Sequence, residues 1–337
     1  MQHAYTTAAL RQHLRHVDAL AAAAGRSAVV RVEAARGYGA GAYLHGWPGR
    51  RWPLRLPGGG GVFFEGLCGD HFRITLARHV QQPLTARHAG RQCPLCGGVL
   101  DADGDHPESC PRLRLRWATP QHNRGRDAVC TVAAEAGMRP TLEQRELWGS
   151  EDAARVHLRP ADVCLPADAP HGLAEAGAAG GAAQGVCIDV VHCQQLCDTH
   201  REKVPAAVLA AAHKRKAQRA APPGYMMYPL AWNSCGGWHE GSLRPLLSKW
   251  AALRKAGEDA EDGENGISGA LRQIELRWLP RLSAAAHWGT AQAIVHLRSV
   301  LAACDGGDAG WGEGAEVPYG DVQQGPISKK AENSGAV

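Results

Sequence analysis

The six residues Val186-Cys187-Ile188-Asp189-Val190-Val191 give the strongest strand signal in the sequence. A short apolar run that is rich in β-branched residues is typical of a buried β-strand. One carboxylate, Asp189, interrupts the run. The run therefore predicts the centre of a sheet and a candidate functional acid on it.

Helices and strands alternate on both sides of this run. The predicted elements are a helix at 121–137 that begins near Pro120, a strand at 163–165, an Ala/Gly-rich loop at 166–185, a basic helix at 201–219, a strand in the apolar stretch 225–232 and a helix at 242–255. This order predicts an α/β domain over 118–255.

Five further segments flank this domain. They are a helical and linker region at 1–90 with helices at 5–24 and within 63–84, a zinc module at 91–112, an acidic linker at 256–267, amphipathic helices at 268–304 and a disordered tail at 305–337. The run Pro57 to Gly61 predicts a flexible break inside the first of them.

Composition limits the classes of protein that fit. The chain has 337 residues, 45% hydrophobic and 21% charged, with a net charge of +4, so local clusters rather than overall charge must indicate nucleic acid. Neither a secretory signal nor a long apolar span is evident, so we expect no secretion and no membrane partner. The 11 cysteines are then better explained as metal ligands or buried thiols than as disulfides.

Cys93, Cys96, His106 and Cys110 have the spacing Cys-x2-Cys-x9-His-x3-Cys. Four such ligands can complete a tetrahedral zinc shell, and a shell made of four protein ligands leaves no position for a reactive water. Gly97 and Gly98 would let backbone amides approach the sulfurs. The sequence thus predicts a structural zinc site, against the alternative of unrelated cysteines in a loop.

A second group of cysteines and histidines lies on the 186–191 strand and after it. Its members are Cys187, His192, Cys193, Cys197 and His200. A metal is conceivable there, but buried thiols beside a surface histidine are the preferred interpretation.

Asp162 and Asp189 each lie on a short strand-like segment, and two acids at neighbouring strand ends can share a Mg²⁺ ion. Such an ion would activate a water and stabilise charge on a phosphate. Lysines on the following helix, at 203, 214 and 216, would complement that charge. On spacing alone the alternative is stronger: an aspartate beside a strand is usually a turn or cap residue, and a basic helix is usually a solvated face.

The order of motifs resembles the C-terminal region of non-LTR retrotransposon polyproteins, in which a Cys-Cys-His-Cys module precedes a restriction-enzyme-like PD-(D/E)xK endonuclease. The matching segments are Cys93 to Cys110 with Pro111, His122-Asn123 to Asp127-Ala128, Arg159-Pro160-Ala161-Asp162-Val163, Asp189-Val190-Val191, Pro229 to Trp232, Gly236-Gly237-Trp238-His239 and Arg277 to Ser283. The likeness covers about 39–300 and is most specific in the zinc module. The polymerase signature Tyr-x-Asp-Asp is absent from the sequence, so the chain looks like a fragment that follows a polymerase.

The resemblance implies a nuclear, Mg²⁺-dependent endonuclease that nicks DNA for target-primed reverse transcription. It implies a restriction-endonuclease-like core, a mixed sheet flanked by helices, with DNA as partner and element RNA as a further candidate. Asp162 and Asp189 match the metal-binding acids, and Lys214, with Lys216 as second choice, matches the lysine. Nucleic-acid contacts are expected from His122, Arg126, Arg215 and Arg219.

Two departures from the family pattern support an alternative. The usual Pro-Asp pair is here Pro160-Ala161-Asp162, and position 191, two residues after Asp189, is valine instead of lysine. The alternative is therefore a catalytically degenerate remnant that binds nucleic acid through the zinc module and the basic helix.

Overall fold

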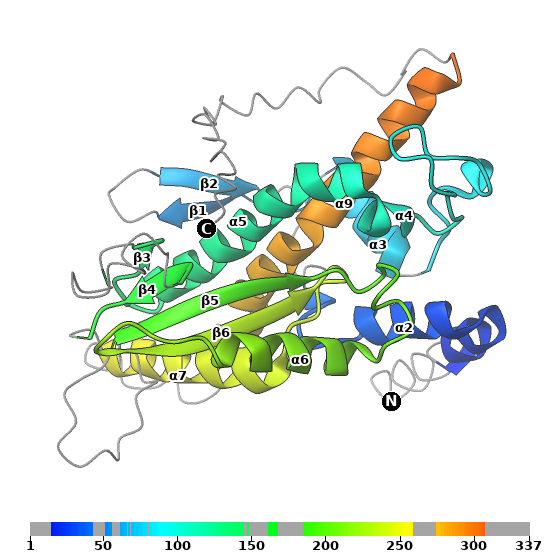
Figure 1. Cartoon of the computed structure of the whole chain (residues 1–337). Helices are drawn as coiled ribbons and strands as arrows, with labels where there is room; N and C mark the ends of the chain where they lie inside the picture. Colours follow the sequence, from blue (N-terminus) through cyan, green and yellow to red (C-terminus); the bar gives the residue numbers. More distant parts are fainter. Residues whose placement is uncertain are drawn as a thin grey trace, which may run out of the picture.

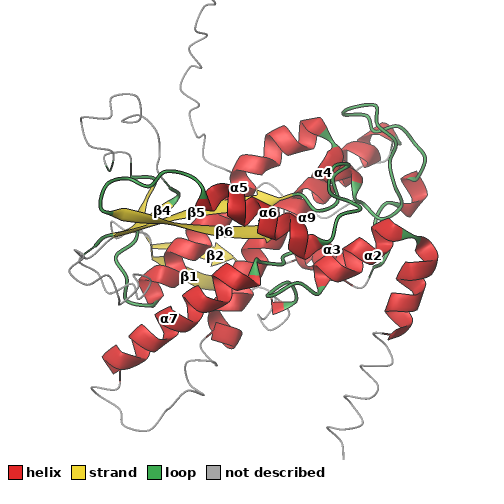
Figure 2. Cartoon of the chain, turned by 60° about the horizontal axis from the view of Figure 1, so that its bottom comes forward, coloured by secondary structure: helices red, strands yellow, loops and turns green. Residues whose placement is uncertain are grey.

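The computed structural model describes residues 15–42, 51–55, 61–65, 67, 69–79, 81–144, 147, 161–167, 185–258 and 274–306. Within these residues the protein is a mixed α/β structure. Figures 1 and 2 show a sheet toward one side of the molecule and a group of helices, including α2, α3 and α4, toward the other.

A four-stranded sheet carries the order β3-β4-β5-β6. Its strands are β3 (Thr141–Leu142), β4 (Val163–Leu165), β5 (Gly185–Cys193) and β6 (Tyr225–Asn233). The pairs β3–β4 and β4–β5 are antiparallel, whereas β5 and β6 are parallel and are joined through helix α6 (Pro205–Ala217). The predicted strands at 163–165, 186–191 and 225–232 are confirmed, and so is the α/β class.

The two faces of β5 meet different helices, as alternating side chains of a strand require. Val186, Ile188 and Val190 join the main core with α5 (Pro111–Glu135), α7 (Glu240–Glu258) and α9 (Leu279–Cys304). Val191 and Cys193 pack on the buried side of α6 instead. Asp189 falls on the α6 face of the strand, and this orientation decides which basic residues can reach it.

Helix α5 begins at Pro111 rather than near Pro120, so the predicted start of the helix is wrong by about three turns. Pro111 occupies the first helical position, where a missing amide hydrogen costs nothing. Pro120 lies inside the helix and forfeits one backbone hydrogen bond, which the packing of the flanking residues offsets. The predicted boundary between the zinc module and the α/β domain, at 112–118, therefore falls within one continuous helix.

Helix α9 is part of the main core and not an appendage at the end of the chain. Trp278, Leu279 and Leu282 belong to that core, and a Cβ on Gly289 would come within 2.4 Å of Gln121 Cβ on α5. The absence of a side chain at Gly289 therefore allows the two helices to cross closely. A π-helical turn, η3 (Ile274–Trp278), leads into α9.

The remaining described elements are small. They are helical residues 15–24, α2 (Arg26–Ala35), the hairpin of β1 (Arg51–Arg55) and β2 (Gly61–Glu65), α3 (Gly69–His79), the turn η2 (Ala86–His88) and α4 (His106–Ser109). The hairpin and β3 are elements that the sequence did not predict. Most of the predicted 57–61 break, 166–185 loop, 256–267 linker and 305–337 tail lies outside the described residues, as does 5–14 of the first helix.

His287 fastens α9 to the segment after α2. Its Nε2 donates a hydrogen bond to the Ala40 carbonyl at 2.9 Å, and Ser283 Oγ donates to the same oxygen at 2.9 Å. Burial lowers the pKa of His287 to about 3; the Ala40 carbonyl opposes this shift, and the charges of Arg78 and His79 add to it. The imidazole is thus neutral in the folded protein at neutral pH.

Lowering the pH from 7.5 to 5 is expected to destabilise the protein through His287. In the unfolded chain the His287 imidazole takes up a proton near pH 6.5, whereas in the folded chain it does so only near pH 3. The contribution of His287 to the free energy of unfolding is therefore present above pH 6.5 and is lost as the pH falls. At pH 5 the loss is about 2 kcal/mol. Urea unfolding at the two pH values measures it. His287→Gln, which keeps a donor for Ala40, should reduce the pH dependence, whereas His16→Gln at an exposed position should not. An unchanged dependence in His287→Gln would contradict this account.

Candidate metal centre and acidic site

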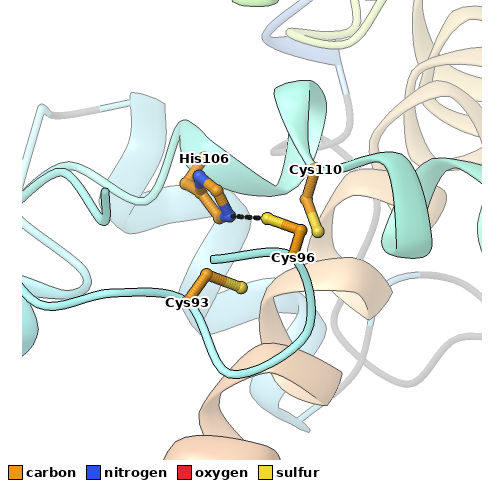
Figure 3. A group of neighbouring side chains, drawn as sticks. All are labelled: Cys93, Cys96, His106 and Cys110. Carbon is orange, nitrogen blue, oxygen red and sulfur yellow. Dashed lines mark hydrogen bonds between the residues drawn. The ribbon is translucent and has the colours of Figure 1, made fainter. Parts of the chain in front are cut away.

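The side chains of Cys93, Cys96, His106 and Cys110 point toward one another (Figure 3), and their ligand atoms all lie within 4.8 Å of one another. His106 Nε2 is 3.4 Å from Cys96 Sγ. The edge of a tetrahedral zinc site between a sulfur and a nitrogen is roughly 3.6 Å, from bonds of about 2.3 and 2.1 Å. The donor set and its dimensions therefore fit a zinc ion.

Local backbone geometry explains why these four residues converge. The Cys93 amide donates to the Gly98 carbonyl at 2.7 Å and the Gly97 amide to the Cys93 carbonyl at 2.8 Å, which closes a tight turn. Gly97 has a φ of 76°, a conformation that glycine adopts without strain. A Cβ on Gly98 would lie 3.0 Å from the His106 ring, so glycine also makes room for the imidazole.

Asp101 fixes the other half of the cluster. Its carboxylate accepts hydrogen bonds from the amides of Asp105 at 2.9 Å and His106 at 2.6 Å, at the start of α4. Helix α4 then carries the chain to Cys110, whose amide donates to the His106 carbonyl at 2.8 Å. Two ligands thus come from the turn and two from the ends of one helical turn.

Burial affects the protonation of the thiols. It raises the pKa of Cys93 and raises that of Cys110 to about 11, with smaller contributions from neighbouring amides and thiols. Without a metal these thiols would be protonated at neutral pH, whereas zinc binds thiolates, so binding would release protons.

One buried carboxylate of the module contacts three other segments of the fold. Glu108 of α4, 3% exposed, accepts hydrogen bonds from Arg78 Nη2 at 2.7 Å, the Leu196 amide at 2.8 Å and Ser234 Oγ at 2.6 Å. It therefore joins the zinc module to α3 and to the segments that follow β5 and β6.

Glu108→Ala is expected to destabilise the protein by about 3–5 kcal/mol, because it leaves the Arg78 guanidinium without its closest carboxylate in a buried site. Urea or thermal unfolding measures the change. Glu240→Ala removes an exposed pair with Arg244 and should cost under about 0.5 kcal/mol. Equal stability losses in the two variants would refute this role of Glu108.

Asp162, the residue before β4, lies opposite Asp189 of β5, because Val163 pairs with Ile188 and the two acids come one residue before and one after that pair. Asp162 Oδ2 accepts a hydrogen bond from the Val190 amide at 2.7 Å, which anchors this carboxylate at the backbone next to Asp189. Asp189 is 3% exposed. Two acids so close together require positive charge nearby.

The positive charge comes from α6 and the residues after it. Lys216 Nζ is 2.8 Å from Asp189 Oδ1, and Arg219 Nη1 is 2.6 Å from Asp189 Oδ2. Lys216, the second choice from the sequence, is thus the lysine that contacts Asp189. Lys214, the first choice, is exposed, and no hydrogen bond joins it to either acid in the described structure. Arg215 is also exposed.

His122 and Arg126, which lie one turn apart on α5, have different partners. His122 Nε2 is 3.0 Å from Asp162 Oδ1. Burial raises the pKa of Asp162, but the His122 hydrogen bond and charge, the Val190 amide and Lys216 outweigh it and hold that pKa below its ordinary value. Arg126 pairs with Asp127 at 2.7 Å and with Glu143, so its guanidinium links α5 to the end of β3 instead of facing a ligand.

The second group of cysteines and histidines, on β5 and after it, is not brought together as a candidate metal group in the described part of the chain. Cys187 Sγ lies 3.9 Å from Cys164 Sγ across the β4–β5 pair, and His192 packs on Trp232 and contacts Gln121 Nε2 at 3.0 Å. His200 Nδ1 lies 3.1 Å from the Gln194 carbonyl and Cys197 Sγ lies 3.2 Å from Thr199 Oγ1. The position of Cys164 opposite Cys187 follows from strand register, which the sequence does not display.

None of the helices in the described ranges combines the length and apolar character that crossing a bilayer requires. Comparison with models of known families, with curated proteins and with solved structures finds no match to this chain.

Proposed function

We propose that this chain is a Mg²⁺-dependent DNA endonuclease domain with a structural zinc module, derived from the C-terminal region of a non-LTR retrotransposon polyprotein. The observation that carries the proposal is the position of Asp162 opposite Asp189 on a mixed sheet flanked by helices, with Lys216 in contact with Asp189. A restriction-endonuclease-like core is the fold that this arrangement suggests, and nuclear DNA is the expected target.

Each residue then has a chemical role. Asp162 and Asp189 offer the oxygen ligands that Mg²⁺ prefers, and each oxygen that accepts one hydrogen bond keeps a further lone pair. When bound, the ion would lower the pKa of a water and stabilise charge on the scissile phosphate. Lys216 supplies positive charge beside the same phosphate, and His122 holds Asp162 in position.

One contact favours the second candidate function, a catalytically degenerate protein that binds nucleic acid. Arg219 contacts Asp189 Oδ2 and Lys216 contacts Oδ1, so two cations balance the charge of Asp189. Such a network is also what a purely structural ion pair would look like. In the active protein, substrate phosphate would draw Arg219 away from Asp189 when the metal binds.

Lys216→Ala is expected to reduce the nicking of supercoiled plasmid in Mg²⁺ by about 10²-fold, because a cation that stabilises transition-state charge in a buried site contributes on this scale. Conversion of supercoiled to open-circular DNA measures the rate. Lys214→Ala, on the same helix with an exposed side chain, is the matched control and should retain full activity. Absence of Mg²⁺-dependent nicking by the wild-type protein would eliminate the enzyme in favour of the binding protein.

A further inference from the structure

Helix α5 presents one continuous outer face between the zinc cluster and Asp162. At helical spacing this face carries Arg112, Leu115, Arg116, Thr119, His122 and Asn123. The first four of these are exposed, and Leu115 is 80% exposed. The opposite face, which includes Leu113, Gln121 and Ala128, is buried against the rest of the fold.

The arginines at the start of this face lack compensating charge. In the described part of the chain no carboxylate pairs with Arg112 or Arg116, in contrast to Arg126 farther along the helix. The first turn of α5 contains no acidic residue. Arg112 lies in that turn, at the positive end of the helix dipole, which disfavours a cation. A binding partner that is an anion would remove this disadvantage.

The length of the face matches a stretch of nucleic acid. Arg112 and His122 are ten residues apart, which is about 15 Å along a helix. A DNA duplex presents a phosphate every ~1.7 Å of its axis, so several phosphates lie within this distance. Thr119, between the arginines and His122, has a short side chain whose hydroxyl can donate a hydrogen bond to a phosphate oxygen. Figure 1 shows α5 running from the zinc module beside α4 toward β3 and β4.

We propose that the backbone of double-stranded DNA lies along this face of α5, with phosphates on Arg112 and Arg116, and reaches the acids at His122. The inference deepens the proposed endonuclease function and rests on it for the choice of DNA. Phosphate recognition thereby falls to Arg112 and Arg116 rather than to Arg126, whose charge Asp127 and Glu143 already satisfy.

The test is binding of a fluorescent duplex of about 25 base pairs, without added Mg²⁺, across a range of salt concentrations. The double variant Arg112→Ala/Arg116→Ala is expected to bind at least about tenfold more weakly, and its salt slope should fall by about 1–2 because two phosphate contacts are lost. Both substitutions favour helix formation, so the fold should be retained. Arg244→Ala, an exposed arginine on α7, is the control and should bind as the wild type does.

Wild-type affinity and salt slope in the double variant would overturn the proposal, whatever the nicking assay gives. Tighter binding of an RNA of the same sequence, with the same dependence on Arg112 and Arg116, would overturn DNA as the occupant. A protein that binds DNA through these arginines but never nicks it would support the docking face and refute the endonuclease.

Discussion

Cys110→Ser is expected to abolish stoichiometric zinc binding and to unfold the module from Cys93 to Cys110. Cys110 is fully buried and is followed directly by α5, so it joins the metal site to the start of that long helix. Binding of zinc to a four-ligand site contributes about 10–16 kcal/mol in small zinc domains, and this free energy stabilises the folded module. Metal analysis of the purified protein measures zinc content, and thermal unfolding measures the stability.

Cys130→Ser is the matched control for this prediction. Cys130 is also fully buried and lies on α5, but no other ligand-type residue joins it in a metal group within the described structure. The control should lose some stability through its buried hydroxyl and keep its zinc. Zinc bound equally by Cys110→Ser and wild-type protein would show that the four residues are not a metal site.

The strand around Asp189 was predictable because its signal is local. Four of the six consecutive residues have β-branched apolar side chains, a run that has few other stable environments, and the zinc cluster is equally local because its ligands lie within 18 residues. Both features specify a structure through neighbours in sequence, so no knowledge of the tertiary fold was needed to find them.

The start of α5 and the position of α9 depend on distant contacts. Pro120 is a helix-breaking signal in isolation, but here the helix continues through it because Gln121 and Gly125 pack closely against α9 and β6. A Cβ on Gly125 would come within 2.2 Å of Trp232, a contact that the sequence gives no sign of. Tertiary packing thus overrides a local preference of about 3 kcal/mol.

The sequence also could not show which of the two lysines contacts Asp189. Lys214 and Lys216 differ by two residues, about 200° around a helix, so only one of them can face Asp189. Which one does so depends on how α6 rotates on the sheet, and Val208, Leu209 and Ala212 set that rotation by packing on Val191 and Cys193. The sequence could place both acids on strands but could not fix this rotation.

Asp198→Asn is the matched control for Asp189→Asn, which removes one of the two proposed Mg²⁺ ligands. Asp198 pairs with Arg201 at 2.5 Å and is 77% exposed, so this substitution removes one carboxylate charge without touching the buried site. Asp198→Asn should leave plasmid nicking unchanged. It measures how far the loss of one surface charge alone affects the activity.

Asp189→Asn, by contrast, is expected to reduce Mg²⁺-dependent nicking by at least about 10²-fold, because loss of one of two carboxylates weakens the metal and its stabilisation of phosphate charge. Asparagine keeps the shape of the side chain and can still accept a hydrogen bond from Lys216, so the fold should persist. DNA binding should persist as well, because neither Arg112 nor Arg116 contacts Asp189. Equal initial nicking rates for wild type and Asp189→Asn would refute a role of Asp189 in catalysis, even with the ion pairs to Lys216 and Arg219 intact.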